Sequence, residues 1–182
     1  GRVLAVAETA LRGKGAEAAL ELFSSLTVEA LSNISSSGGD PRADKVSMFK
    51  SGKGSLRASR LIKGVAIRRR VPMENLPNNL ENAPVAVIGG ELKIRSMTRD
   101  AQIQVSSAEQ LDQFINAEKS RKDAISDSII ATGARVVLCG GEVDKEVLHR
   151  LADEGILTIA ELDESEIRNA SEATGSSVVD SV

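Results

Sequence analysis

Residues 135–160 of this chain read RVVLCGGEVDKEVLHRLADEGILTIA, and they set the class of fold. The segment 135–139 is mainly apolar, as expected of a buried strand, and 156–160 repeats that character. Between them, residues 143–154 space their apolar side chains at helical intervals. A strand, a helix and a second strand at this spacing predict an α/β fold in which the two strands pair in parallel.

The flanking sequence extends this pattern in both directions. After residue 160 it predicts a helix over 164–173 and a last short strand at 178–179. The segment 72–77 is bracketed by prolines, which cannot continue a strand ladder, and is predicted to be a loop. Apolar runs or alternations predict further strands at 61–67, 85–88, 92–94 and 103–105.

The segment 106–131 predicts a long helix. Ser106 and Glu109 fit a capping box, and a glycine follows the last turn. Ala117 is the only apolar residue over 116–123, and a helix that is polar on all sides is solvated. We therefore expect the C-terminal half of this helix to pack on the body and the N-terminal half to project from it.

The N-terminal part of the chain has a different character. Residues 3–34 are rich in Ala, Leu and Glu and predict helices. Turn-forming residues then gather at 35–41 and again at 50–55, as in a linker. We expect residues 1–58 to form a helical segment with a linker, and residues 59–182 to form the α/β domain.

The composition argues against several classes of function. The 182 residues carry a net charge of −3, with three Phe and no Trp or Tyr, which argues against binding to phosphate backbones or stacking on bases. Cys139, the only cysteine, lies in an apolar run and is expected to be a buried thiol in a reducing compartment. No apolar stretch reaches the roughly 20 residues that cross a bilayer. We expect a cytoplasmic protein with neither nucleic-acid nor membrane partners.

No motif for nucleotide or metal chemistry is complete. The run 13–15 (Gly-Lys-Gly) lacks the rest of a phosphate-binding loop and is interpreted as a helix break. The glycine pairs at 89–90 and 140–141 follow predicted strands without forming a dinucleotide-binding fingerprint, and indicate strand-end turns. His149 has no second histidine with which to bind a metal ion. No metal ligand and no catalytic residue are predicted.

Two charge clusters are candidate binding surfaces. The run 68–70 (Arg-Arg-Arg) is either a charged edge strand that discourages aggregation or a contact surface for acidic partners. The predicted helix 143–154 is amphipathic, and its polar side by itself indicates a solvated face. That side carries Lys145, Glu146, His149, Arg150 and Asp153, opposite Val143, Val147, Leu148, Leu151 and Ala152.

The order of motifs resembles that of the group II chaperonins, the family of thermosome subunits. The resemblance is close over 61–179 and looser over 9–34. It rests on LIKGVAI at 61–67, LENAPVAVI at 80–88, DAQIQV at 100–105, ATGARVVLC at 131–139 and ATG at 173–175.

This resemblance implies an apical domain, a swivelling β/β/α fold with a long helical protrusion at about 95–123, preceded by a helical intermediate-domain segment. Such a domain binds unfolded or partly folded proteins, and its protrusion forms part of a built-in lid. The resemblance implies no enzyme activity and no cofactor for this chain, because ATP and magnesium bind another domain of the full-length subunit. That subunit assembles with its neighbours into a double ring.

The resemblance also implies which residues bind. The substrate-binding surface combines the helix matching 142–154 with the loop matching 68–79. The loop keeps only the second proline of the family's His-Pro-x-Met-Pro motif, and a charged pair stands at 121–122, so substrate range and lid contacts are expected to differ. The substrate-binding candidates are Arg68, Arg69, Arg70, Met73, Leu76, Lys145, Glu146, His149, Arg150 and Asp153, and the lid candidates are Ile103, Val105, Leu111, Phe114 and Ile115.

Two other functions remain open from the residues. One is a small α/β enzyme or phosphocarrier that uses His149. It would want this histidine at a helix N-terminus, where backbone amides stabilise a phosphate, whereas His149 is predicted in mid-helix. The other is a purely structural interaction module.

Overall fold

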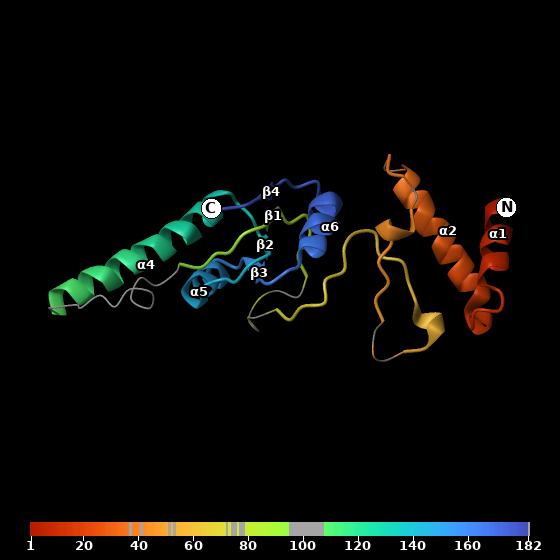
Figure 1. Cartoon of the computed structure of the whole chain (residues 1–182), viewed down its shortest axis with the longest axis horizontal. Helices are drawn as coiled ribbons and strands as arrows, with labels where there is room; N and C mark the ends of the chain where they lie inside the picture. The colour runs from red at the N-terminus through yellow and green to blue at the C-terminus, as the bar shows by residue number, and fades with distance from the viewer. Residues whose placement is uncertain are drawn as a thin grey trace. The chain divides into compact units, whose positions relative to one another are not determined.

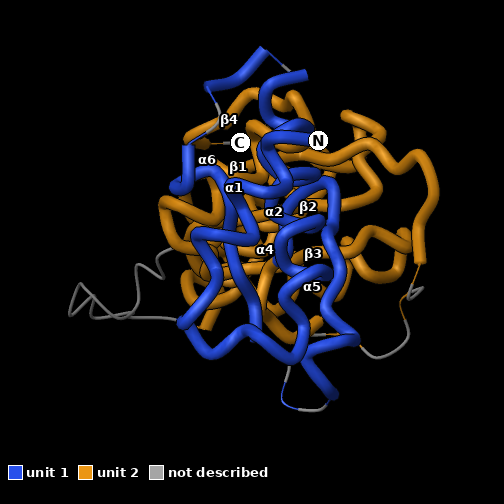
Figure 2. The backbone as a smooth tube through the Cα atoms, turned by 90° about the vertical axis from the view of Figure 1, so that its right-hand side faces the viewer, with its two compact units in different colours: residues 1–66 blue, residues 67–182 orange. Residues whose placement is uncertain are grey.

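The computed structural model of the chain describes residues 1–36, 38–40, 42–50, 52, 54–71, 73, 76, 79–94 and 108–181. These residues form two compact units, Gly1–Ala66 and Ile67–Val182, which Figure 2 distinguishes by colour. The named strands all lie in the second unit, which is therefore the α/β part of the chain.

The first unit is helical. Its elements are α1 (Arg2–Leu11), η1 (Glu17–Ala19), α2 (Leu20–Ser36), η2 (Ala43–Lys45) and η3 (Leu56–Ala58), of which the η elements are 3-10 turns. The helices α1 and α2 pack against each other. Between them, Gly13 and Gly15 adopt φ angles of 75° and 76°, the left-handed backbone that glycine supplies at helix ends. The helix break predicted at 13–15 is confirmed.

The second unit contains a four-stranded parallel sheet in the order β3-β2-β1-β4 (Figure 1). Its elements are β1 (Val85–Ile88), α4 (Ala108–Ala131), β2 (Val136–Cys139), α5 (Lys145–Asp153), β3 (Leu157–Ile159), α6 (Glu164–Thr174) and β4 (Val178–Val179). The predicted α/β class and the parallel pairing of β2 with β3 are confirmed.

Helices cover both faces of this sheet. The chain moves from β1 to β2 to β3 in one direction, and because such crossovers are right-handed, α4 and α5 cover the same face. The chain then returns to β4 through α6, which covers the opposite face. The core on the α4 and α5 side contains Ile88, Val137 and Cys139 from the strands and Leu92, Ile129, Val147, Leu151 and Ile156 around them.

The glycine pairs after β1 and β2 allow the backbone to pack closely. A Cβ atom on Gly90 would lie 2.1 Å from the carbonyl oxygen of Asp180, and one on Gly140 would lie 2.5 Å from that of Gly89. The strand-end interpretation of both pairs is confirmed. Open α/β sheets bind ligands where the strand order reverses, here between β1 and β4, and the backbone of Asp180 approaches Gly90 closely at this position.

Two predicted strands are absent as such. Residues 61–67 lie in the described part of the chain but belong to no strand. An extended segment becomes a strand only by hydrogen bonding to a neighbour, and no described strand pairs with these residues. The strand predicted at 92–94 is reduced to a single bridge between Leu92 and Val143. The strand predicted at 103–105 lies outside the described residues.

Helix α4 projects beyond the sheet at its N-terminal end, as predicted (Figure 1). The expectation that 116–123 is solvated on all sides is wrong at its C-terminal end. The side chain of Lys122 is only 10% exposed, because its ammonium group is paired with carboxylates instead of facing water. Asn116, Ala117 and Lys119 are exposed, so the helix is solvated only on the N-terminal side of Lys122.

Candidate functional site

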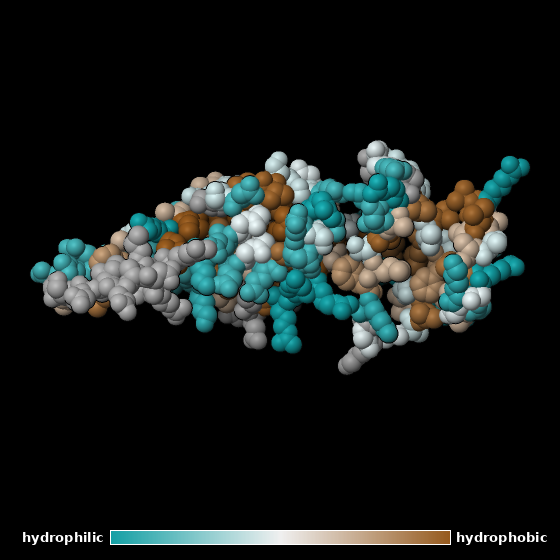
Figure 3. Space-filling model, in the orientation of Figure 1, coloured by the Kyte–Doolittle hydropathy of each residue, from teal (hydrophilic) through white to brown (hydrophobic). Residues whose placement is uncertain are grey.

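The first candidate surface is the polar side of α5. The helix begins at Asp144, whose carboxylate accepts a hydrogen bond of 3.1 Å from the backbone N–H of Glu146. Val147 and Leu151 are fully buried, so the predicted amphipathic arrangement is confirmed. Hydrophilic side chains cover α5 on the face shown in Figure 3. The exposed polar residues of the helix are Lys145, Glu146, His149 and Asp153, while Arg150 is half-buried.

Two of these candidates bind residues of α4. Arg150 forms ion pairs with Asp123 at 2.6 Å and with Asp127 at 2.5 Å. Glu146 forms an ion pair of 3.3 Å with Lys122. Glu146 and Arg150 are therefore engaged in ion pairs with α4, although the Glu146 side chain is still 64% exposed, and Lys145, His149 and Asp153 complete the exposed polar surface of the helix.

The sequence drew attention to Lys122 only as part of the charged pair at 121–122, and did not predict its burial. Besides Glu146, its Nζ lies 3.1 Å from Glu118 and 3.3 Å from Asp144. Burial alone lowers the pKa of Lys122, but the hydrogen bonds to the three carboxylates outweigh it and raise the pKa above its ordinary value. The signal that could have revealed it is its position four and seven residues before Ser126 and Ile129, which are both buried.

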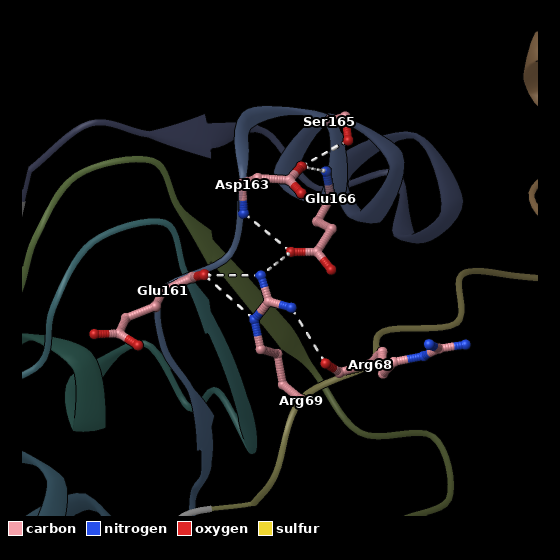
Figure 4. A network of polar contacts seen from close by, with 6 residues as sticks. All are labelled: Arg68, Arg69, Glu161, Asp163, Ser165 and Glu166. Atoms are coloured by element: carbon pink, nitrogen blue, oxygen red, sulfur yellow. Dashed lines mark hydrogen bonds and ion pairs between the residues drawn. The ribbon is translucent and has the colours of Figure 1, made fainter. Parts of the chain in front are cut away.

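The second candidate surface begins with the arginine run 68–70. Arg69 donates to the carbonyl oxygen of Glu161 at 3.2 Å and to the carboxylate of Glu166 at 2.9 Å (Figure 4). Residues 68–70 belong to no strand, so the edge-strand interpretation of the run is wrong. Its middle arginine instead attaches the run to the segment that follows β3.

Glu166 has two roles in this network. Its carboxylate accepts from Arg69 and also from the backbone N–H of Asp163 at 3.0 Å, while the Asp163 carboxylate accepts from the N–H of Glu166 at 2.8 Å. These reciprocal bonds form the capping box that begins α6. The Ser165 hydroxyl and the N–H of Glu166 hold the pKa of Asp163 below its usual value, and the Arg69 guanidinium acts in the same direction. Arg69 and the start of α6 therefore share one carboxylate.

The remaining candidates of the loop differ in exposure. Arg70 is exposed, and the Arg68 side chain points away from the Arg69 network (Figure 4). Met73 and Leu76 are both half-buried. The structure thus distinguishes Arg69, which is engaged in contacts within the domain, from the exposed Arg70 and the half-buried Met73 and Leu76.

The starts of α5 and α6, together with Arg69, lie at the carboxyl edge of the sheet. Because α5 begins after β2 and α6 begins after β3, both helices start at this edge. Arg69, bound beside the start of α6, lies there too. The ion pairs of Lys122 with the first turn of α5, and of Arg150 with Asp127, show that α4 and α5 run parallel. The outer part of α4 therefore extends beyond the same edge.

Three of the five lid candidates lie on the outer part of α4. Leu111 is 42% exposed and Ile115 is 55% exposed; they are four residues apart and so share one face of the helix. Phe114 is half-buried. Ile103 and Val105 lie outside the described residues. The described tip thus presents apolar side chains to the solvent.

The other sequence features hold no chemical site in the described part of the chain. His149 is exposed in the middle of α5. Cys139 is fully buried and its Sγ contacts the carbonyl oxygen of Gly90 at 3.2 Å; burial raises the pKa of this thiol. The described side chains form no cluster of metal ligands, and no described helix is both long and apolar enough to cross a membrane.

Comparison with known proteins gives consistent matches over the length of the chain. The profile of the TCP-1/cpn60 chaperonin family matches residues 1–182. Thermosome subunit 1 of Haloferax volcanii is 33% identical over 177 residues, which are 97% of this chain and 31% of that protein. A thermosome subunit of Pyrococcus horikoshii is 32% identical over 183 residues, covering 99% of this chain and 33% of that protein.

A solved structure has a similar fold. It is the open-state monomer of a group II chaperonin from Methanococcoides burtonii, with a TM-score of 0.66 and 24% sequence identity. The match covers 98% of this chain and 39% of that one. Together with the sequence matches, it means that the chain spans about a third of the length of the relatives that it resembles.

Proposed function

The chain belongs to the TCP-1/cpn60 chaperonin family, and from that premise we propose that it is the substrate-binding and lid-forming portion of a group II chaperonin subunit that assists protein folding. On this proposal residues 59–182 are the apical domain, with a swivelling β/β/α fold and a protrusion at about 95–123. Residues 1–58 are a helical segment of the intermediate domain. The α/β unit with its projecting helix and the helical character of the first unit both support this assignment.

The observation that carries the proposal is the mixed surface at the carboxyl edge of the sheet. Lys145 begins α5 at this edge, the exposed Arg70 follows Arg69 in sequence, and the half-buried Met73 and Leu76 come a few residues later. An unfolded protein offers no fixed shape, and a mixed polar and apolar surface can contact many sequences. At Gly90, by contrast, the backbone of Asp180 approaches so closely that no side chain would fit between them.

The candidate residues divide by role on this proposal. We assign contact with unfolded or partly folded proteins to Arg68, Arg70, Met73, Leu76, Lys145, His149 and Asp153, and a positioning role to Arg69, Glu146 and Arg150. The lid contacts fall to Leu111, Phe114 and Ile115, together with Ile103 and Val105. Neighbouring subunits of a double ring are the partners of the full-length protein, which works in the cytoplasm and binds ATP and magnesium in another domain.

The alternative based on His149 has no support in the geometry. His149 is the fifth residue of Lys145–Asp153, where the backbone N–H groups bond within the helix. A phosphohistidine needs free N–H groups near its phosphate, and those lie at the start of the helix.

A binding experiment tests the proposed surface. Reduced, unfolded α-lactalbumin, an acidic protein, is captured by the 182-residue chain and by a variant with Arg70→Ser and Lys145→Ser. Two exposed charge contacts of about 0.7 kcal/mol each correspond to a roughly tenfold weaker capture. The salt dependence of capture should decrease as well, because the contacts removed are the ones that salt screens.

The matched control carries Arg135→Ser and Arg168→Ser. It loses the same charge at exposed positions, one before β2 at the opposite edge and one within α6, and should capture like the parent. A third variant, Met73→Ser with Leu76→Ser, measures the apolar contribution. Equal capture by the variant with Arg70→Ser and Lys145→Ser, by the control and by the variant with Met73→Ser and Leu76→Ser would contradict the proposed surface.

A further inference from the structure

The helices α4 and α5 exchange charged side chains in both directions. Lys122 of α4 contacts the carboxylates of Asp144 and Glu146, each at 3.3 Å, at the start of α5. Arg150 of α5 contacts Asp123 and Asp127 of α4. Each helix thus donates one cation to a pair of acids on the other.

Lys122 lies at the point where α4 leaves the body. It continues the buried stripe of Ser126 and Ile129 by one more turn, and its side chain is only 10% exposed. Toward the N-terminus, Arg121, Lys119 and the preceding residues 115–117 are exposed. Of the ion pairs that join α4 to α5 in the described residues, those of Lys122 are the farthest toward the tip.

Asp144 connects this contact to the framework of α5. One of its carboxylate oxygens caps the helix by accepting from the N–H of Glu146, and the other contacts Lys122. The cap fixes the direction of the carboxylate, because both oxygens are used. Lys122 is therefore held by a group that is itself part of the start of α5.

We propose that these four inter-helix pairs form an ionic clamp, with Lys122 and Arg150 as positioning residues that fix the direction in which the outer half of α4, residues 108–121, leaves the body. The two contact points at Lys122 and Asp127 are five residues apart, or about 7.5 Å along the helix axis. Two anchors at this spacing resist a rotation that a single anchor would permit. The outer half is about 20 Å long, so a small rotation at the clamp becomes a large displacement at the tip.

The ion pairs of the clamp differ in how far they are exposed to solvent. Lys122 and Asp144 are only 10% and 16% exposed, so salt screens this pair little, whereas Arg150 and its two partners are 38%, 43% and 61% exposed. The inference concerns the geometry of α4 and does not depend on which proteins the chain binds. It gives Glu146 and Arg150 of α5 a structural role as ion-pair partners of α4.

A distance measurement tests the clamp. Spin labels are placed on the 182-residue chain at Gln113→Cys on the outer half of α4 and at Ala173→Cys on α6, both exposed positions. Cys139 is fully buried and stays unlabelled. Pulsed electron paramagnetic resonance then gives the distribution of distances between the labels. The parent should give one narrow distribution, and Lys122→Met should broaden it while circular dichroism shows the helices retained.

Two variants serve as comparisons. Lys119→Met removes an exposed lysine from the same helix and should leave the distribution narrow, whereas Lys122→Arg keeps the cation and should restore it. If Lys122→Met does not fold, the variant with Asp123→Asn and Asp127→Asn replaces it, because it releases Arg150 without leaving a buried charge unpaired; it should broaden the distribution. A folded variant of either kind with the narrow distribution of the parent would overturn the proposal.

Discussion

Thr158 places a hydroxyl group in the apolar layer between β3 and α5. The residue is 1% exposed and pairs in register with Val137, whose side chain faces the same core. Its Oγ1 has no hydrogen-bond partner among the described residues. A buried hydroxyl without a partner keeps the cost of losing water and gains nothing in return.

We expect Thr158→Val to raise the free energy of unfolding by about 1 kcal/mol, because valine keeps the shape and removes the unpaired group. Urea denaturation measures the change. Thr132→Val is the control, since the Thr132 hydroxyl donates to Ile129 at 2.6 Å and accepts from the N–H of Ala134 at 3.2 Å. That variant should lose about 1 kcal/mol. Destabilisation by both changes would mean that the Thr158 hydroxyl has a partner.

Single residues also mark the limit of what the sequence could predict. The burial of Val147 and Leu151 follows from helical spacing alone, and the exposure of His149 follows from the same wheel. Lys122 does not, because a lysine among polar neighbours looks solvated until acids from another helix are placed beside it. The same holds for Arg69, whose partners Glu161 and Glu166 are distant in sequence.

At the scale of elements, the sequence was sufficient to predict a strand or helix where the residues of that segment alone indicate it. The strands β1 and β2 are apolar runs ended by glycine pairs, and α6 begins with an aspartate that caps it. It was insufficient for 61–67, because a half-apolar extended segment is a strand only when a neighbour pairs with it. Pairing is a property of two segments, and one segment cannot predict it.

The cap of α6 gives a prediction about pH. The pKa of Asp163 is lowered from 3.8 by the Ser165 hydroxyl and the N–H of Glu166. A carboxyl group whose pKa is lower in the folded state stabilises the protein above its unfolded pKa, and this contribution is lost as the pH falls through the folded value. We expect Asp163→Asn to be less stable than the parent at neutral pH, and the difference to disappear below about pH 4.

Thermal unfolding of the parent and of Asp163→Asn across this range measures the effect. Asp153→Asn is an exposed change at the C-terminal end of α5. It controls for the loss of one negative charge and should show a smaller difference in stability. A difference for Asp163→Asn that stays constant down to acid pH would mean that the cap does not depend on the ionised carboxylate.

At the scale of the whole molecule, two sequence features could suggest a nucleotide site, and neither has the geometry of one. The Gly-Lys-Gly run at 13–15 forms the turn after α1, and the glycine pair after β1 packs closely against the backbone of Asp180. We expect calorimetric titration of the 182-residue chain with ATP and magnesium to show no saturable binding. Micromolar affinity would contradict both the assignment of residues 59–182 as an apical domain and the reading of 13–15 as a helix break.

The enclosed position of Lys122 also ties the identities of residues in two helices together. If residue 122 changes to an uncharged side chain, Asp144 and Glu146 are left facing Glu118 with no cation between them, and like charges at this distance repel. If an acid of α5 changes first, Lys122 loses part of what balances its burial. Positions 118, 122, 144 and 146 are therefore expected to co-vary across homologous sequences, with an apolar residue at 122 accompanied by fewer acids at the start of α5.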